Sequence, residues 1–186
     1  MTTTTAAPFG RLMTAMITPM TSDGAVDYDG AARLAAYLVG DMRNEGLVVN
    51  GTTGEAPTTT DEEKARLVKV VREAAGDRAT VIAGVGTNIT AHSVELARQA
   101  EKAGAHGVLI VTPYYSKPAQ DALAAHFTAI ANATALPSII YDIPSRTGTA
   151  VATDTLVRLA AHDEAFHHEL ADGLPYGGAA HLELGG

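Results

Sequence analysis

Five short apolar runs, spaced almost evenly along the chain, constrain its fold more than any other feature of the sequence. They begin at positions 12, 47, 80, 108 and 138, at intervals of 35, 33, 28 and 30 residues. Each run is nearly continuous in Val, Ile, Leu and Met, which is typical of strands buried on both faces. The runs are Leu12–Thr18, Leu47–Asn50, Thr80–Val85, Val108–Thr112 and Ser138–Asp142.

The segments between these runs carry apolar residues at helical spacing. Thr60 and Glu63 form the pattern of a capping box, which predicts a helix start just before one such stripe. That stripe contains Leu67, Val70, Val71 and Ala74. Further helices are expected over Asp27–Arg43, around Val94, Ala97 and Ala100 with a stop at Gly104, over Pro118–Ala133 and over Thr153–Ala161.

This alternation predicts an α/β fold with a parallel sheet and right-handed crossovers. Either an open doubly wound sheet or a (β/α)8 barrel has such a pattern. A complete TIM barrel needs roughly 250 residues. The 186 residues of this chain therefore accommodate only about the first five βα units of one.

Composition excludes several functional classes. The formal net charge of −8 argues against binding to a nucleic-acid backbone. The absence of cysteine excludes disulfides, thiolate nucleophiles and zinc–thiolate sites. The segment Met1–Pro8 lacks the basic and apolar regions of a signal peptide, and no apolar stretch is long enough to span a membrane. We expect a cytoplasmic protein.

The end of the chain departs from the repeating pattern. Residues 159–186 contain no Lys or Arg, five acidic residues and four of the seven His, and no β-branched run appears where a sixth strand is due. We predict a partial barrel over residues 1–162 and a divergent acidic, His- and Gly-rich tail over 163–186. The group His162, Glu164, His167, His168 and Glu169 lacks the His-Glu-x-x-His spacing of a zinc site, so we expect no metal there.

Reactive groups of parallel α/β folds lie at the carboxyl ends of the strands. Gly51–Glu55 could hold a carboxylate or phosphate with its backbone N–H groups, or could be an ordinary tight turn. Gly84-Val85-Gly86 lacks the third glycine of a dinucleotide fingerprint, which favours a packing turn. Tyr141 is either a proton donor or a core ring, and Arg146 either binds a carboxylate or is a surface arginine.

Over about residues 10–162 the sequence resembles the dihydrodipicolinate synthase (4-hydroxy-tetrahydrodipicolinate synthase) family of pyruvate-dependent Schiff-base aldolases. The arginine at position 146 is typical of these synthases and not of the related neuraminate lyases. The motifs that carry the resemblance are Thr14–Pro19, Gly51–Glu55, Val111–Tyr115 and Tyr141–Gly148.

The resemblance implies a TIM-barrel lyase, usually a tetramer, that condenses pyruvate with L-aspartate 4-semialdehyde in lysine and diaminopimelate biosynthesis. It implies that Thr53 binds the pyruvate carboxylate and that Arg146 binds the carboxylate of the semialdehyde. Tyr141 would transfer protons, with Thr52 and Tyr115 completing the relay and Tyr115 supplied across a subunit interface. No cofactor or metal is expected.

Two positions depart from the family pattern. Asn88 and Tyr114 match a lysine-effector site, but His92 stands where an acidic residue would hold the effector amine, which argues against feedback inhibition. The Schiff-base lysine is missing as well: Glu169 occupies its place, and a carboxylate cannot form an imine. The lysines of the chain are Lys64, Lys69, Lys102 and Lys117.

We therefore expect the chain to lack synthase activity. An open sheet of five strands would leave an apolar edge exposed, which predicts a poorly soluble or molten polypeptide. The alternatives are another pyruvate or 2-oxo-acid aldolase of the same superfamily, and a non-catalytic partial barrel.

Overall fold

Parallel strands and helices alternate in both of the units into which the described chain divides. The computed structural model describes residues 8–162, 166–170 and 180–181. The first unit contains the described residues up to Ala83 together with residues 103–106. The second contains residues 84–102 and the described residues from Gly107 onward. Each unit is described by itself.

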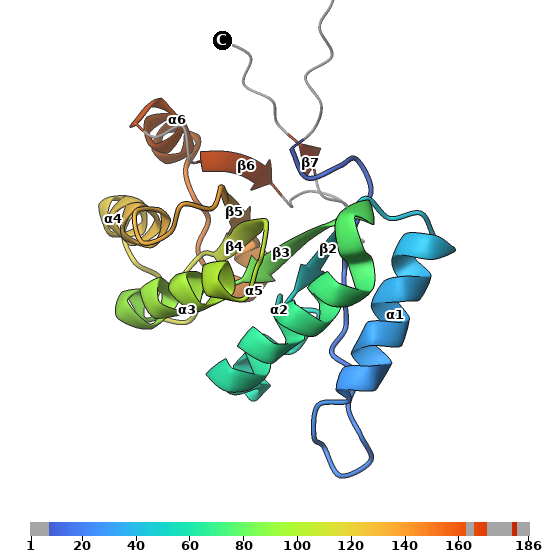
Figure 1. The fold of residues 1–186 in the computed structure, drawn as a ribbon. Helices are drawn as coiled ribbons and strands as arrows, with labels where there is room; N and C mark the ends of the chain where they lie inside the picture. Colours follow the sequence, from blue (N-terminus) through green and yellow to red (C-terminus); the bar gives the residue numbers. More distant parts are fainter. Residues whose placement is uncertain (1–7, 163–165, 171–179, 182–186) are drawn as a thin grey trace, which may run out of the picture. The chain divides into compact units, whose positions relative to one another are not determined.

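Three parallel strands form the sheet of the first unit. Strand β1 (Met13–Ala15) pairs with β2 (Gly46–Val49), and β2 pairs with β3 (Thr80–Gly84). Two helices, α1 (Tyr28–Gly40) and α2 (Asp61–Ala75), pack against each other (Figure 1). Two short 3-10 helices, η1 (Ala56–Thr58) and η2 (Gly76–Arg78), stand before and after α2. These bounds agree with the predicted runs to within a few residues.

The start of α2 confirms the predicted capping box. The side chain of Thr60 accepts a hydrogen bond from the backbone N–H of Glu63 at 3.2 Å, and the Glu63 carboxylate accepts one from the N–H of Thr60 at 2.8 Å. These bonds satisfy two donors that an uncapped helix leaves unpaired. Helix α1 has a simpler cap with one such bond, in which the Asp27 carboxylate accepts from the Gly30 N–H at 2.8 Å.

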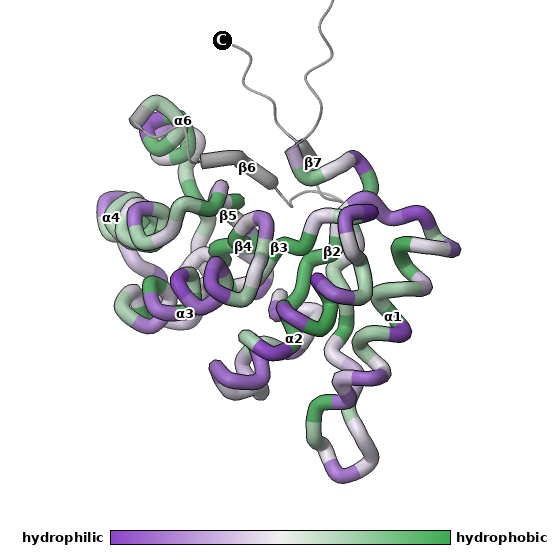
Figure 2. The backbone as a smooth tube through the Cα atoms, viewed as in Figure 1, coloured by the Kyte–Doolittle hydropathy of each residue, from purple (hydrophilic) through white to green (hydrophobic). Residues whose placement is uncertain are grey.

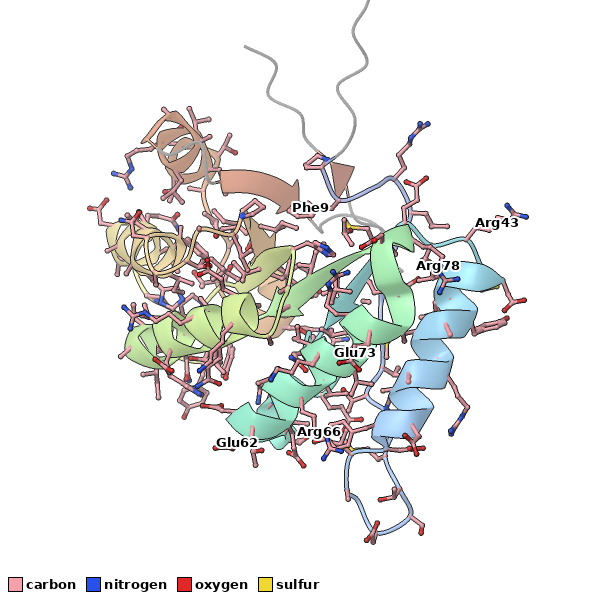
Figure 3. All side chains as sticks on the ribbon, viewed as in Figure 1. Phe9, Arg43, Glu62, Arg66, Glu73 and Arg78 are labelled. Carbon is pink, nitrogen blue, oxygen red and sulfur yellow. The ribbon has the colours of Figure 1, made fainter. Side chains whose placement is uncertain are left out.

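The buried face of α2 differs from the predicted stripe. Val70 and Ala74 are only half-buried, and a lysine joins the buried set. The buried residues are Lys64, Leu67, Val68, Val71 and Ala75. Charged side chains from this helix, including the labelled Glu62, Arg66 and Glu73, are exposed (Figure 3). The Arg66 guanidinium also lies 3.8 Å above the centre of the Tyr28 ring of α1, so it joins the two helices on their outer side.

The second unit continues the same alternation. Strand β4 (Gly107–Val111) pairs in parallel with β5 (Ser138–Asp142). Helices α3 (Thr90–Lys102) and α4 (Gln120–Ala131) contact each other, and α4 also contacts α6 (Thr153–His162). A four-residue helix, α5 (Pro144–Thr147), follows β5 and was not predicted.

A sixth strand is present where the sequence pattern gave no sign of one. Strand β6 (Phe166–Leu170) pairs in parallel with β5, and β7 (Ala180–His181) pairs antiparallel with β6. The missing run of β-branched residues therefore did not mean a missing strand, because backbone pairing with β5 is open to any non-proline sequence. The register sets Tyr141 opposite Glu169.

The interior of each unit is built from its strands and one face of its helices. Apolar residues concentrate along β2, β3, β4 and β5 (Figure 2). Leu47 and Val81 are fully buried in the first unit, and Val108 and Ile110 are fully buried in the second. This is the pattern expected of parallel strands covered on both faces. None of the helices in the described part of the chain has the length and apolar character needed to cross a membrane.

Candidate functional site

In the first unit, the predicted anion cradle is a tight turn at the carboxyl end of β2. Asn50 has a positive φ of 57°, and the N–H of Gly54 donates to the Gly51 carbonyl at 3.1 Å. Gly54 is packed so closely that an added Cβ would lie 3.1 Å from the Met16 carbonyl oxygen. The Thr18 hydroxyl donates to the Gly54 carbonyl at 2.7 Å. The turn is thus anchored from beneath by the segment that follows β1.

The exposed side of this turn presents Thr52 and Thr53. Both residues are exposed. Within the described residues, their hydroxyls and their backbone N–H groups donate to no other group. Unpaired N–H groups of a turn, flanked by hydroxyls, are suited to a carboxylate. The structure therefore leaves the cradle interpretation of Gly51–Glu55 chemically open, alongside the turn that it also forms.

A buried lysine lies beneath the same segment, and sequence reasoning did not single it out. The ammonium of Lys64 donates to the Thr59 carbonyl, and the Lys64 carbonyl accepts from the Asn50 side-chain amide at 3.1 Å. Burial lowers the pKa of Lys64, against the opposing effect of Asp61 and Glu63. Its spacing from Leu67 and Val71 was the signal that could have placed it on the buried face.

In the second unit, the ends of β4 and β5 are tied together by polar groups. The Thr112 N–H donates to the Tyr141 carbonyl at 3.1 Å. The Asp142 carboxylate is buried and accepts from the Val151 N–H at 3.1 Å and from the Thr112 hydroxyl at 3.5 Å. These bonds fix the backbone on either side of Tyr141, whose side chain is half-buried at the carboxyl end of β5.

The loops that follow β4 and β5 also meet. The N–H of Tyr115 donates to the Thr147 carbonyl at 3.4 Å, and Tyr115 has a positive φ of 75°. Its side chain is 91% exposed. Arg146 is exposed on α5, one residue before Thr147. The second unit thus brings Tyr115, Tyr141 and Arg146 onto two joined loops, whereas Thr52 and Thr53 belong to the first unit.

The remaining sequence candidates are structural or lie outside the described residues. Gly86 is a packing turn, as predicted, because an added Cβ would lie 2.3 Å from the Val111 nitrogen. Glu164 falls outside the described residues, and only the backbone of residues 166–170 is described. In the described part of the chain, no three His, Cys, Asp or Glu residues gather in a way that could hold a metal ion.

In each unit, parallel strands alternate with helices and polar groups follow the carboxyl ends of the strands, which defines a chain of the α/β class. The chain belongs to the dihydrodipicolinate synthetase family, whose family model matches residues 8–166.

Two relatives with curated names illustrate the match. The 4-hydroxy-tetrahydrodipicolinate synthase of Acidothermus cellulolyticus is 67% identical over 157 residues, which cover 84% of this chain and 51% of the relative. The 4-hydroxy-tetrahydrodipicolinate synthase 2 of Streptomyces coelicolor is 62% identical over 172 residues, which cover 92% of this chain and 57% of the relative. The chain therefore spans about half the length of the curated relatives it matches.

Solved structures agree with this assignment. Dihydrodipicolinate synthase from Cyanidioschyzon merolae, with lysine bound, has a TM-score of 0.85 at 41% identity, covering 90% of this chain and 57% of that one. The synthase from Bacillus anthracis has a TM-score of 0.84 at 40% identity, covering 88% and 56%. The predicted fold class, α/β with the first βα units of a TIM barrel, is confirmed.

Proposed function

We propose that this chain carries the amino-terminal part of a 4-hydroxy-tetrahydrodipicolinate synthase, a lyase that condenses pyruvate with L-aspartate 4-semialdehyde. The observation that carries the proposal is the pair of joined loops in the second unit. There a phenol, Tyr141, lies one residue before the end of a buried strand, and a guanidinium, Arg146, follows on the next turn. The identity to named synthases supports it. We propose that the protein takes part in lysine and diaminopimelate biosynthesis and that it is located in the cytoplasm.

Each site residue has a role that its chemistry supports. The unpaired backbone N–H groups of Thr52 and Thr53, with the Thr53 hydroxyl, bind the pyruvate carboxylate as an anion. Where a lysine amine is present at the strand opposite, Tyr141 would give and take protons while carbinolamine and imine form, because a phenol held in place acts as acid and as base. Thr52 and Tyr115 extend this relay. The Arg146 guanidinium binds the carboxylate of the semialdehyde, a planar match that gives two parallel hydrogen bonds.

The exposure of Tyr115 supports its proposed place in a partner subunit. Tyr115 is 91% exposed and its backbone φ is 75°. Its ring therefore points into solvent and does not pack within its own unit. We propose a homo-oligomer, a tetramer as the family resemblance implies, in which this ring completes the relay of a neighbouring copy. One solved relative is a monomeric variant of dihydrodipicolinate synthase, so light scattering should measure the oligomeric state of this chain directly.

The chain as it stands lacks the nucleophile of this reaction. Glu169 faces Tyr141 in the strand register, which is where the resemblance puts the Schiff-base lysine. None of the four lysines lies on a strand: Lys64, Lys69 and Lys102 are on helices, and Lys117 is in the loop after β4. We propose that the chain is inactive in imine formation, and that residues 163–186 are a divergent tail joined to a partial barrel at residue 162.

Restoring the amine tests both halves of this proposal. Full-length wild type and the variant Glu169→Lys are each incubated with pyruvate and borohydride, which reduces an imine to a stable adduct that mass spectrometry locates. We expect no adduct on the wild type and one adduct at position 169 in the variant. In that background, Tyr141→Phe should slow trapping by about a hundredfold, the order expected for loss of a proton-transfer group.

Other outcomes contradict the proposal in separable ways. An adduct on any wild-type lysine would overturn the claim of inactivity. Failure of Glu169→Lys to trap pyruvate, in a chain that still shows the native circular dichroism spectrum, would favour the non-catalytic partial barrel. Trapping of several 2-oxo acids as fast as pyruvate would favour another aldolase of the superfamily.

A further inference from the structure

The loop after β4 is held in an unusual backbone conformation that positions a lysine. Tyr115 and Lys117 have positive φ values of 75° and 48°, two non-glycine residues in the left-handed region within three positions. Such a conformation is unfavourable for residues with a side chain and persists only where surrounding contacts enforce it. The hydrogen bond from Tyr115 N–H to the Thr147 carbonyl, 3.4 Å long, is one of those contacts.

The lysine lies across the loop that carries Arg146. A Cβ added to Gly148 would come within 2.9 Å of Lys117 Cε and 3.8 Å of its Nζ. Gly148 also has a positive φ of 78°. The lack of a side chain at this position therefore allows the turn and leaves room for the Lys117 side chain. The Lys117 ammonium lies next to Gly148, two residues after Arg146.

No carboxylate in the described part of the chain neutralises these two cations. Lys117 and Arg146 are exposed, and neither forms an ion pair with a described residue. The acidic groups of the neighbouring elements are engaged elsewhere: Asp142 is buried and accepts from Val151 N–H, and Asp121 pairs with Arg158 at 3.0 Å. Two unpaired positive charges on joined loops attract a small anion.

We propose that Lys117 is a second substrate-binding cation, acting with Arg146 on the carboxylate of the aldehyde substrate. This proposal rests on the function proposed above, in which Arg146 binds the carboxylate of the semialdehyde. It adds Lys117 as a second group that binds the same carboxylate. Arg146 fixes the orientation of the carboxylate through two parallel hydrogen bonds, and Lys117 adds a point charge that raises affinity and favours acids over their amides or esters.

Binding of a simple carboxylate tests this without any need for turnover. The full chain, labelled with ¹⁵N, is titrated with butyrate and, separately, with its neutral counterpart butyramide, following the amide signals of residues 115–117 and 146–148. We expect butyrate to shift these signals and butyramide to leave them unchanged. Lys117→Met should weaken butyrate binding about three- to fivefold, the scale of one exposed charge interaction, and added salt should reduce that difference.

Matched variants separate this proposal from the one it rests on. Lys117→Arg should retain binding, and Lys102→Met, which removes an exposed lysine from α3 of the same unit, should leave binding as in the wild type. Arg146→Met should weaken binding more than Lys117→Met, by about tenfold. Unchanged binding in Lys117→Met beside a loss in Arg146→Met would overturn the role of Lys117 alone. A loss in Lys117→Met beside no change in Arg146→Met would support Lys117 and contradict the assignment of Arg146.

Discussion

His126 gives the sharpest test of the packing in the second unit. Its side chain on α4 is 5% exposed, and its Nδ1 lies 2.9 Å from the hydroxyl of Thr90, the first residue of α3. Its Nε2 is buried and finds no hydrogen-bond partner among the residues that the structure describes. Protonation would add a charge and an unpaired N–H donor to this apolar contact between helices. Burial accordingly lowers the pKa of His126 from 6.5 to about 4.

The sign of the resulting pH dependence follows from which state binds the proton. Below pH 6.5 the unfolded chain takes up a proton at His126, and the folded chain does not do so until about pH 4. Above pH 6.5 His126 therefore does not lower the free energy of unfolding. As the pH falls from 6.5 to about 4, the free energy of unfolding decreases, and below about pH 4 this loss is complete. At about 1.4 kcal/mol for each pH unit, the loss is up to about 3 kcal/mol.

Two measurements check this prediction. An NMR titration of the His126 ring proton, assigned from its absence in His126→Asn, should have its midpoint near pH 4. The free energy of unfolding of the wild type should fall more steeply between pH 6.5 and 4 than that of His126→Asn, which cannot titrate. A midpoint near 6.5 would refute the buried environment of His126, and would instead agree with the molten state that the open sheet edge predicts.

Two further substitutions test individual contacts. Gly86→Ala would place a Cβ 2.3 Å from the Val111 nitrogen and 2.9 Å from its carbonyl oxygen. Urea denaturation should therefore show a decrease of about 3 kcal/mol in the free energy of unfolding. The control Gly40→Ala, whose nearest neighbour would be 3.8 Å away, should leave this free energy unchanged. An equal effect of the two would contradict the proposed close packing. Thr60→Ala removes the cap of α2 and should destabilise the chain by about 1 kcal/mol in the same assay, whereas an unchanged midpoint would mean that the cap contributes no net stability.

The sequence predicted the regular elements because their determinants are local. All five apolar runs became strands, and the capping box at Thr60 and Glu63 marks the start of α2. Strand β6 escaped detection because the residues Phe166–Leu170 lack an apolar run, and their pairing depends on the backbone of β5. The short helix α5 also escaped, since four residues are too few to show helical spacing.

The candidate site divides in the same way. Tyr141, Arg146 and Gly51–Glu55 could be named from the sequence, because each is a chemically distinct group directly after a buried run. The place of the Lys117 side chain could not be named in this way, because a lysine in a loop carries no sequence pattern that predicts its contacts. Lys117 lies against Gly148, which is distant in the sequence. Lys64 was missed although its spacing from Leu67 and Val71 puts it on the buried face of α2.

Local order along the chain thus determined the βα repeat, the helix starts and the polar clusters at the strand ends, since hydrophobic periodicity and capping act within a few residues. Only the tertiary structure decided which loops are joined, where the Lys117 side chain lies and which residue of β6 pairs with Tyr141. Those features depend on backbone hydrogen bonds and close contacts between residues 28 to 32 positions apart, and no local pattern encodes their geometry.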